Sequence, residues 1–323
     1  MAQKKKTDIY EKITNIVIKG LQEKGLNWFK SWTNEYGQEM LPLNHISGKA
    51  YRGINVFICY ASAMEYGYPT NEWIGYKQAK DMGYKVPKGA TEIFYWYTMY
   101  FDATKKKWIY FGEYKKLTKG MSAEDKANRF TQRMFPKSQF VWNIAQLTET
   151  LDGKSATVEP KWTPQKPMIT EDKNAEIKKA KAVYKNMELK PSLRHGGSRA
   201  YYRPSSHHIQ MPKLETFKTS EDYYKVLFHE MVHSTGNEQI LNRKGVAKFN
   251  GFGTETYSRE ELVAEVGSMM LCSKINLIPS DEYTNSKAYI NGWVKYLKNH
   301  KKEVMTACAQ SQKAVEYILN ETK

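Results

Sequence analysis

The sequence predicts an α+β protein built from two domains, a small mixed domain followed by a mainly helical one. The longest strand-like aromatic runs lie in the first 150 residues, whereas beyond about residue 170 the apolar residues mostly follow a helical period. A chain of 323 residues is long enough for two hydrophobic cores. Between the two parts, residues 148–170 contain three prolines and little periodicity. We therefore expect a domain over residues 1–150, a linker over 151–170 and a second domain over 171–323.

The first half begins with an amphipathic segment and continues with strands. Residues 8–25 read as a helix closed by Gly25, with one apolar face made of Ile9, Ile13, Ile16, Val17 and Leu21. A strand or short helix is expected to begin at Tyr51. Two strand-like runs, 91–101 and 107–114, flank a short polar turn with three lysines and predict a loose hairpin. Residues 141–147 close this aromatic part.

The second half reads as mostly helical. After a first helix over about 172–187, residues 196–212 are strand-like at both ends. Thr219 with Asp222 three residues later suits the start of a helix, and Gly236 can close it. The remaining helices are expected over about 219–235, 258–273, 284–300 and 302–321.

Composition narrows the classes of protein. A hydrophobic content of 41% argues against global disorder, and a formal net charge of +16 favours a polyanionic partner, with an ordinary lysine-rich surface as an equal alternative. No run approaches the roughly 20 apolar residues that span a bilayer, and no apolar segment follows the basic N-terminus. The three cysteines, Cys59, Cys272 and Cys308, form neither a zinc knuckle nor an even disulfide set. We expect a reduced, cytoplasmic protein that does not engage a membrane.

The sequence His229-Glu230-Met231-Val232-His233 carries the strongest chemical signal. Positions i and i+4 of a helix face the same way, so His229 and His233 can direct two imidazoles at one metal ion. Glu230 beside them can accept a proton from a water bound to that ion. The alternative is a helix whose histidines merely pack or face solvent. The presence of acidic residues suited as a third ligand favours the metal site.

That third ligand is expected from the segment 258–265. Glu261 and Glu265 share a helical face, so we predict Glu261 as the ligand and Glu265 as the hydrogen-bond partner of an imidazole. Glu260 is the main rival, and Glu261 has a second interpretation as part of a capping box with Ser258. Two histidines and one glutamate leave a fourth position open, which is typical of a catalytic zinc site. Zn²⁺ is therefore expected, and Mn²⁺, Co²⁺ or Ni²⁺ can occupy such a site.

Three neighbouring residues have weaker interpretations. Tyr257 could donate to an oxyanion, but an ordinary packed tyrosine is the preferred interpretation. His207 and His208 could approach the cleft, although we interpret them as a solvated polar pair.

The first half also has features of a single-strand binder. Six of the eight tryptophans lie there (Trp28, Trp32, Trp73, Trp96, Trp108 and Trp142), and lysines are interleaved with aromatic residues. Bases stack on aromatic rings and lysines neutralise phosphates. Most of these rings are also needed for a core. The residues predicted to contact nucleic acid are Trp28, Trp32, Tyr51, Arg52, Trp73, Lys77, Lys80, Lys85 and Lys88.

With the motifs HEMVH, YSREELVAEVGSMML and AYYRPSSHHIQMP, the second half resembles the metallopeptidase domain of the ArdC antirestriction family, a gluzincin-like zincin. The first half resembles the same family's single-stranded-DNA-binding domain through PLNHISGKAYRGINVF and NEWIGYKQAKDMGYKVPKGA. The resemblance covers nearly the whole chain. One departure is that the family usually has an acidic residue where this chain has His207 or His208.

The resemblance implies protection of incoming DNA against restriction, for a plasmid, a conjugative element or a phage. The expected protein binds single-stranded DNA and carries a zinc peptidase site directed at a protein of a restriction or DNA-bound system. Two alternatives are a protease acting on proteins bound to DNA, and a non-catalytic DNA-binding protein in which the metal is structural.

Overall fold

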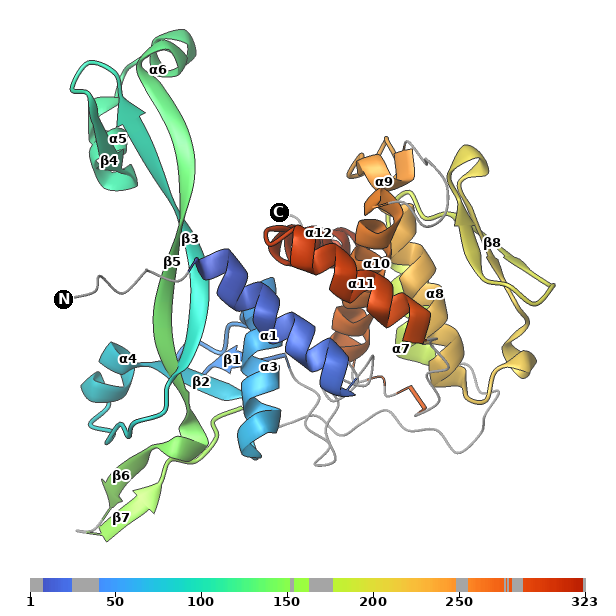
Figure 1. The fold of residues 1–323 in the computed structure, drawn as a ribbon, viewed down its shortest axis with the longest axis horizontal. Helices are drawn as coiled ribbons and strands as arrows, with labels where there is room; N and C mark the ends of the chain where they lie inside the picture. Colours follow the sequence, from blue (N-terminus) through green and yellow to red (C-terminus); the bar gives the residue numbers. More distant parts are fainter. Residues whose placement is uncertain are drawn as a thin grey trace.

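The computed structural model describes residues 8–24, 41–151, 154–162, 177–247, 255–275, 277, 279–280 and 287–321. It confirms an α+β fold with a mixed N-terminal part and a mainly helical C-terminal part (Figure 1). The elements of the N-terminal part are α1 (Ile9–Lys24), β1 (Leu43–Asn44), α3 (Ile54–Tyr66), β2 (Glu72–Gly75), α4 (Tyr76–Asp81), β3 (Thr91–Asp102), β4 (Lys107–Tyr110), α5 (Phe111–Leu117), α6 (Ala123–Arg129), β5 (Phe130–Asn143), η1 (Ile144–Gln146), β6 (Thr148–Leu151) and β7 (Lys154–Thr157). Those of the C-terminal part are α7 (Lys178–Asn186), β8 (Ser192–His195), β9 (Tyr201–Arg203), η2 (Pro204–Ser206), β10 (His208–Met211), η3 (Leu214–Thr216), α8 (Ser220–Ser234), α9 (Lys244–Ala247), α10 (Glu255–Ile275), α11 (Lys287–Asn299) and α12 (Glu303–Ile318).

A five-stranded sheet of order β1-β2-β5-β3-β4 organises the N-terminal part. Strands β3 and β5 pair antiparallel along their whole shared length, from Thr91 opposite Val141 to Asp102 opposite Phe130. In Figure 1 this pair is a long ribbon that carries β4, α5 and α6 at one end and the β6–β7 hairpin at the other. We call the outer part of this ribbon, residues 95–137, the arm.

Strand β5 was not among the expected elements. Along FTQRMFPKSQFVWN the exposed residues do not alternate with buried ones, because β2 pairs only with residues 141–143 and most of the strand lies at a sheet edge. Pro136 would argue against a central strand but is tolerated at such an edge. The hairpin expected over 91–114 is present as β3 and β4, with Phe111 to Tyr114 turning into α5 instead of extending the second strand.

Part of the stretch in which we expected a linker is folded. Strands β6 and β7 form an antiparallel hairpin, and Val158 is buried in a small core with Ile74 and Leu147. The backbone N–H groups of Lys161 and Trp162 then donate to the Glu72 carboxylate at 3.1 and 2.6 Å. These contacts attach residues 154–162 to the N-terminal sheet, and residues 163–170 lie outside the described part of the chain.

Helix α1 joins the two halves of the molecule. Its apolar face packs on α11 and α12, so Ile13, Val17 and Leu21 belong to the same hydrophobic cluster as the C-terminal helices. Glu11 pairs with Lys301 at 2.9 Å, and the Thr14 hydroxyl donates to the Lys301 carbonyl at 2.7 Å. Figure 1 shows α1 between the long ribbon and the C-terminal helices. Gly25, the expected end of this helix, lies outside the described residues.

The C-terminal part is built around two long helices. Helices α8 and α10 pack together, and β9 and β10 of the three-stranded sheet β8-β10-β9 lie against α8. The approach of the two helices is close at Gly267, where a Cβ atom would lie 2.8 Å from Val232 Cγ2. Helix α10 is described from Glu255, so Ser258 lies inside the helix and is not its N-cap, which argues against the second interpretation of Glu261 as part of a capping box. No helix in the described ranges is long and apolar enough to cross a bilayer.

Candidate metal centre

Helix α8 presents the two histidines, and its ends are fixed by local interactions. The Thr219 hydroxyl accepts a hydrogen bond from the Asp222 N–H at 3.2 Å, which is the predicted N-terminal cap. At the other end, Gly236 lies just after the helix and packs against Val246, where a Cβ atom would lie 2.5 Å from Val246 Cγ2. His229 and His233 then lie one turn apart on the face toward α10, with ring centroids 4.8 Å apart.

Three side chains bring their ligand atoms together. The Nε2 atoms of His229 and His233 are 3.1 Å apart. Glu261, on α10, places Oε2 3.5 Å from the first Nε2 and Oε1 3.4 Å from the second. Tetrahedral metal bonds of about 2.0–2.2 Å require ligand atoms about 3.3–3.6 Å apart. The triangle therefore fits a divalent cation, and His229, His233 and Glu261 are the group in the described residues that could hold one.

The second ring nitrogen of each histidine faces another carboxylate. His229 Nδ1 lies 3.3 Å from Glu265 Oε2, and His233 Nδ1 lies 3.3 Å from Glu260 Oε1. Such partners fix the tautomer and orientation of a ligating imidazole. The three glutamates of α10 thus occupy three different positions. Glu261 lies among the ligand atoms, while Glu265 and Glu260, the rival of Glu261, each orient one ring.

Two buried cations hold these outer carboxylates, and sequence reasoning missed both. Arg243 donates to Glu260 through Nε at 3.0 Å and Nη2 at 2.6 Å, and also to the Thr235 hydroxyl and the Val232 carbonyl. Lys225 Nζ donates to Glu265 Oε1 at 2.9 Å. Lys225 lies one helical turn before His229, which is a usable signal in the sequence. Arg243 reaches the site from the segment after α8, and no local pattern reveals it.

The electrostatics of the group favour a cation. Burial would raise the pKa of Glu261, but hydrogen bonds from both histidines and their charges hold it well below its usual range. Burial would also raise the pKa of Glu265, but Lys225 and His229 outweigh this effect and lower the pKa to about 2. For His233, burial would lower the pKa, but the carboxylates of Glu260 and Glu261 raise it to about 9. All these carboxylates are therefore ionised at neutral pH.

Glu230 is buried next to the first histidine on α8. Its negative charge is one of the influences that raise the pKa of His229. Glu230 is therefore buried beside the ligand triangle, and its role as a base stays a prediction. Tyr257 lies in α10, but its side chain is outside the described part of the structure.

His207 and His208 are not the solvated pair we expected. His208 is buried and lies 2.7 Å from the Ser206 hydroxyl, and burial lowers its pKa. His207 bridges the Tyr202 hydroxyl at 2.9 Å and the Leu189 carbonyl at 2.7 Å. Both histidines are thus held within the fold, and neither belongs to the candidate metal group.

The residues predicted to contact nucleic acid divide into three groups. Trp28 and Trp32 lie outside the described residues. Trp73 has 0% of its surface exposed, so its ring is a core residue and cannot stack on a base, which corrects that expectation. Tyr51 is half-buried, and Arg52 is exposed and paired with Glu316 of α12. Four lysines on and after α4 are exposed: Lys77, Lys80, Lys85 and Lys88.

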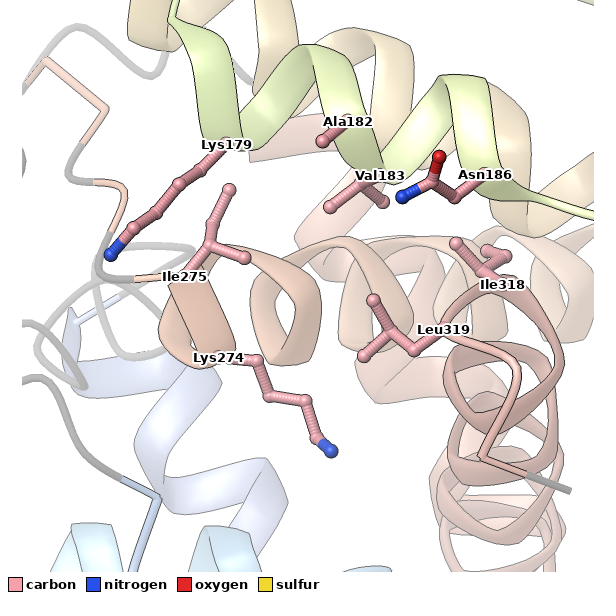
Figure 2. Close-up of a pocket in the computed structure, with 8 residues that line it drawn as sticks. All are labelled: Lys179, Ala182, Val183, Asn186, Lys274, Ile275, Ile318 and Leu319. Atoms are coloured by element: carbon pink, nitrogen blue, oxygen red, sulfur yellow. The ribbon is translucent and has the colours of Figure 1, made fainter. Parts of the chain in front are cut away.

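Among the described residues of the C-terminal part, those that line the two cavities below do not include the ligand triangle. One of about 400 Å³ lies between α7 and the ends of α10 and α12, with Val183, Ile275 and Ile318 in its wall and Lys179 and Lys274 at its rim (Figure 2). The other, of about 350 Å³, borders the outer carboxylate through Arg243 and Glu260.

Family models match both halves of the chain. A model described as the N-terminal domain of anti-restriction factor ArdC matches residues 7–142. A model described as zincin-like metallopeptidase matches residues 178–310, which include both histidines and the glutamates of α10.

Individual relatives extend this likeness over the whole chain. The protein y4eC of Sinorhizobium fredii is 28% identical over 314 residues, which is 97% of this chain and 92% of that protein. Two DNA primases TraC of Escherichia coli are 29% and 28% identical, and the chain spans only 20% and 28% of their lengths.

Solved structures match as well. Crystal structures of the antirestriction protein ArdC from plasmid R388 superimpose with TM-scores of 0.72 for the metal-free form and 0.70 for the Mn(II)-bound form. In both comparisons the identity is 27%, and 97% of each chain is covered. On the strength of two matched domains in the same order and one shared overall structure, this chain belongs to the family of ArdC-type antirestriction proteins, with an ArdC N-terminal domain followed by a zincin-like metallopeptidase domain.

Proposed function

We propose that this protein protects DNA of a mobile element or phage against restriction in the cytoplasm, by binding single-stranded DNA and by cleaving a protein at a zinc site. The observation that carries the proposal is the triangle of His229 Nε2, His233 Nε2 and the Glu261 carboxylate. The two Nε2 atoms are 3.1 Å apart, and the carboxylate places Oε2 3.5 Å from the first and Oε1 3.4 Å from the second. Three ligands leave a fourth tetrahedral position for water, as in catalytic zinc sites.

The chain's own residues divide the work of hydrolysis. A bound zinc ion would supply a water of lowered pKa and polarise the scissile carbonyl. Glu230 would accept the water's proton on its carboxylate and hold it for the leaving amine. Glu265 and Glu260 would keep the two imidazoles oriented with Nε2 toward the ion. His2Glu ligation favours zinc, and because one of the R388 ArdC crystal structures is Mn(II)-bound, manganese is the first competitor to test.

Support for DNA binding comes from the N-terminal half. Its family model is that of an ArdC N-terminal domain, and exposed lysines line α4 and the loop after it. Lysines at this density contribute a salt-dependent attraction to phosphates.

The Glu230→Gln variant tests the hydrolytic part. Removing the base should lower cleavage of a labelled casein by about 10²-fold or more while leaving zinc content unchanged, because all three ligands remain. Glu238→Gln, an exposed glutamate just after α8, is the matched control and should cleave like the wild type. Full proteolysis by zinc-loaded Glu230→Gln contradicts the mechanism. Antirestriction that survives in this variant would instead favour a protein that acts by binding alone.

A further inference from the structure

The arm has two faces that differ in what covers them. Beyond the body of the molecule β3 and β5 form a two-stranded ribbon, and β4 adds a third strand at its outer end (Figure 1). Helix α5 packs on one face, where the Tyr114 ring stacks on Tyr100 at 3.7 Å and meets Phe130 edge-on at 5.1 Å. We call this the covered face; its rings and those of α5 form the small core of the arm.

The opposite face carries a continuous row of aromatic rings. Alternate residues of a strand, and residues directly opposite in an antiparallel pair, point to the same side. Tyr97 lies opposite Phe135 on β5, and Phe101 lies opposite Trp108 on β4, with Tyr110 two residues further on. We call this set the aromatic row; its members are Tyr97, Phe101, Trp108, Tyr110 and Phe135.

The rings of the row are in contact with one another; four of them are partly buried, and Tyr110 is the ring most open to solvent. Tyr97 stacks near Tyr110 and near Phe135, both at 6.0 Å, and Trp108 lies 5.0 Å from Phe135. Tyr110 is 64% exposed. The described ring contacts between α5 and the strands fall on Tyr100 and Phe130 of the covered face, not on this row.

The charge of the arm complements a phosphate backbone. Residues 95–137 contain ten Lys or Arg against four Asp or Glu, a net charge of +6 out of the chain's +16. Two of the cations share the face with the rings, since Arg133 is opposite Met99 and Lys137 is opposite Tyr95. The Arg133 guanidinium lies over the Trp108 ring at 5.6 Å. Aromatic faces flanked by cations are the two components of a single-strand site.

We propose that the aromatic row of the arm is a stacking platform for the bases of single-stranded DNA, with Arg133 and Lys137 holding its phosphates. The proposal rests on the proposed DNA binding and assigns it a surface. A single strand is favoured over a duplex because only unpaired bases offer their faces to a flat sheet. The platform lies outside the residues that the sequence singled out for contact with nucleic acid.

Two neighbouring residues provide a matched test. Tyr110 and Phe111 are 64% and 57% exposed, but the first belongs to the aromatic row and the second contacts Tyr100 of the covered face. Fluorescence anisotropy with a labelled oligo(dT) of 20 nucleotides should show that Tyr110→Ala weakens binding by about tenfold, the order expected for one lost stack. Tyr110→Phe should bind like the wild type, and so should Phe111→Ala, with thermal melting confirming that each variant is folded.

The salt dependence separates stacking from charge. Arg133→Gln should lower the slope of log affinity against log salt by about one, as for one lost phosphate contact, whereas Tyr110→Ala should leave the slope unchanged. Equal affinities of the wild type and Tyr110→Ala, or equal losses in Tyr110→Ala and Phe111→Ala, would overturn the platform while leaving the proposed function intact. If Tyr110→Ala lost binding to anionic vesicles but kept its affinity for oligo(dT), the aromatic row would bind a lipid surface and not DNA bases, which would also overturn the proposal. A wild type that binds no single-stranded DNA would instead remove the proposed function itself.

Discussion

Arg243 shows how a single residue outside the ligand triangle can set the properties of the metal centre. It is buried, and its guanidinium is divided between the Glu260 carboxylate and the end of α8. Glu260 in turn faces His233 Nδ1. Removing the Arg243 cation leaves the Glu260 carboxylate buried without its counter-ion, and the His233 ring that Glu260 orients is then less firmly held.

We therefore expect Arg243→Gln to weaken zinc affinity by about 10- to 100-fold, measured by competition with a chromogenic chelator. The same change should cost about 3 kcal/mol or more of unfolding free energy, because a buried ion pair loses one partner. Lys244→Gln, at the exposed neighbouring position, is the control. An Arg243→Gln protein that is folded and binds zinc with undiminished affinity contradicts this role.

Asp102 gives a pH-dependent signature at the outer end of the arm. Hydrogen bonds from Arg129 lower its pKa to about 2, with further help from the Lys105 and Thr104 N–H groups against the opposing effect of burial. Because the folded-state pKa lies below the unfolded value of about 3.9, Asp102 stabilises the fold above pH ~4 and loses that effect as the pH falls toward 2. Melting curves between pH 5 and 2 should show a steeper loss for the wild type than for Asp102→Asn. Parallel curves would contradict the assignment.

At the scale of residues, the sequence could predict part of the metal centre. The i and i+4 spacing of His229 and His233 is a local property of a helix, so their meeting could be foreseen. The helical face shared by Glu261 and Glu265 favoured Glu261 over Glu260, but which face of α10 turns toward α8 depends on packing that no local pattern encodes. Trp73 was misjudged because a count of aromatic residues does not distinguish a core ring from an exposed one.

At the scale of elements, the metal centre depends on the spacing of α8 and α10. A Cβ at Gly267 would lie 2.8 and 2.9 Å from the two methyl carbons of Val232. Gly267→Ala gains about 1 kcal/mol of helix propensity but crowds the interface, where overpacking typically costs about 1–3 kcal/mol. We expect the second effect to win, with a lower melting temperature and weaker zinc binding. Gly112→Ala in α5, where a Cβ meets no atom within 4 Å, should be neutral or stabilising. A stabilised Gly267→Ala with normal zinc affinity would contradict the close packing.

The elements themselves were predictable to different degrees. Helices α1, α8 and α12 lie close to their expected bounds, because apolar periodicity or capping signals mark them in the sequence. Strand β5 shows no alternation of buried and exposed residues, because little of the ribbon is covered and one buried face is not needed along its length. The hairpin β6–β7 was likewise hidden by prolines that follow it, since Pro160 and Pro164 suggested a linker.

At the scale of the whole molecule, one hydrophobic cluster runs from α1 and α3 into the C-terminal helices. Arg52 of the N-terminal half pairs with Glu316 of α12. The two domains named by their family models are therefore joined by packing as well as by the chain. This arrangement holds the arm and the metal centre on one body, as the proposed delivery of a metal site to DNA requires.

The net charge of +16 predicts that the affinity of the intact protein for DNA falls steeply as salt rises. Because aromatic rings stack only on unpaired bases, anisotropy titrations should also show tighter binding to single-stranded than to duplex DNA of equal length. Equal affinities for the two forms across the salt series would remove the preference for single strands.

The central claim is that His229, His233 and Glu261 bind a metal together, and one measurement tests it most directly. Anomalous diffraction from crystals of the zinc-loaded protein, recorded on both sides of the zinc edge, should place one ion between α8 and α10. We predict bonds of about 2.0–2.2 Å from the two Nε2 atoms and a Glu261 oxygen, with the remaining position facing Glu230. Zinc held by Glu260 or Glu265 in place of Glu261, or found only elsewhere in the molecule, would contradict the account.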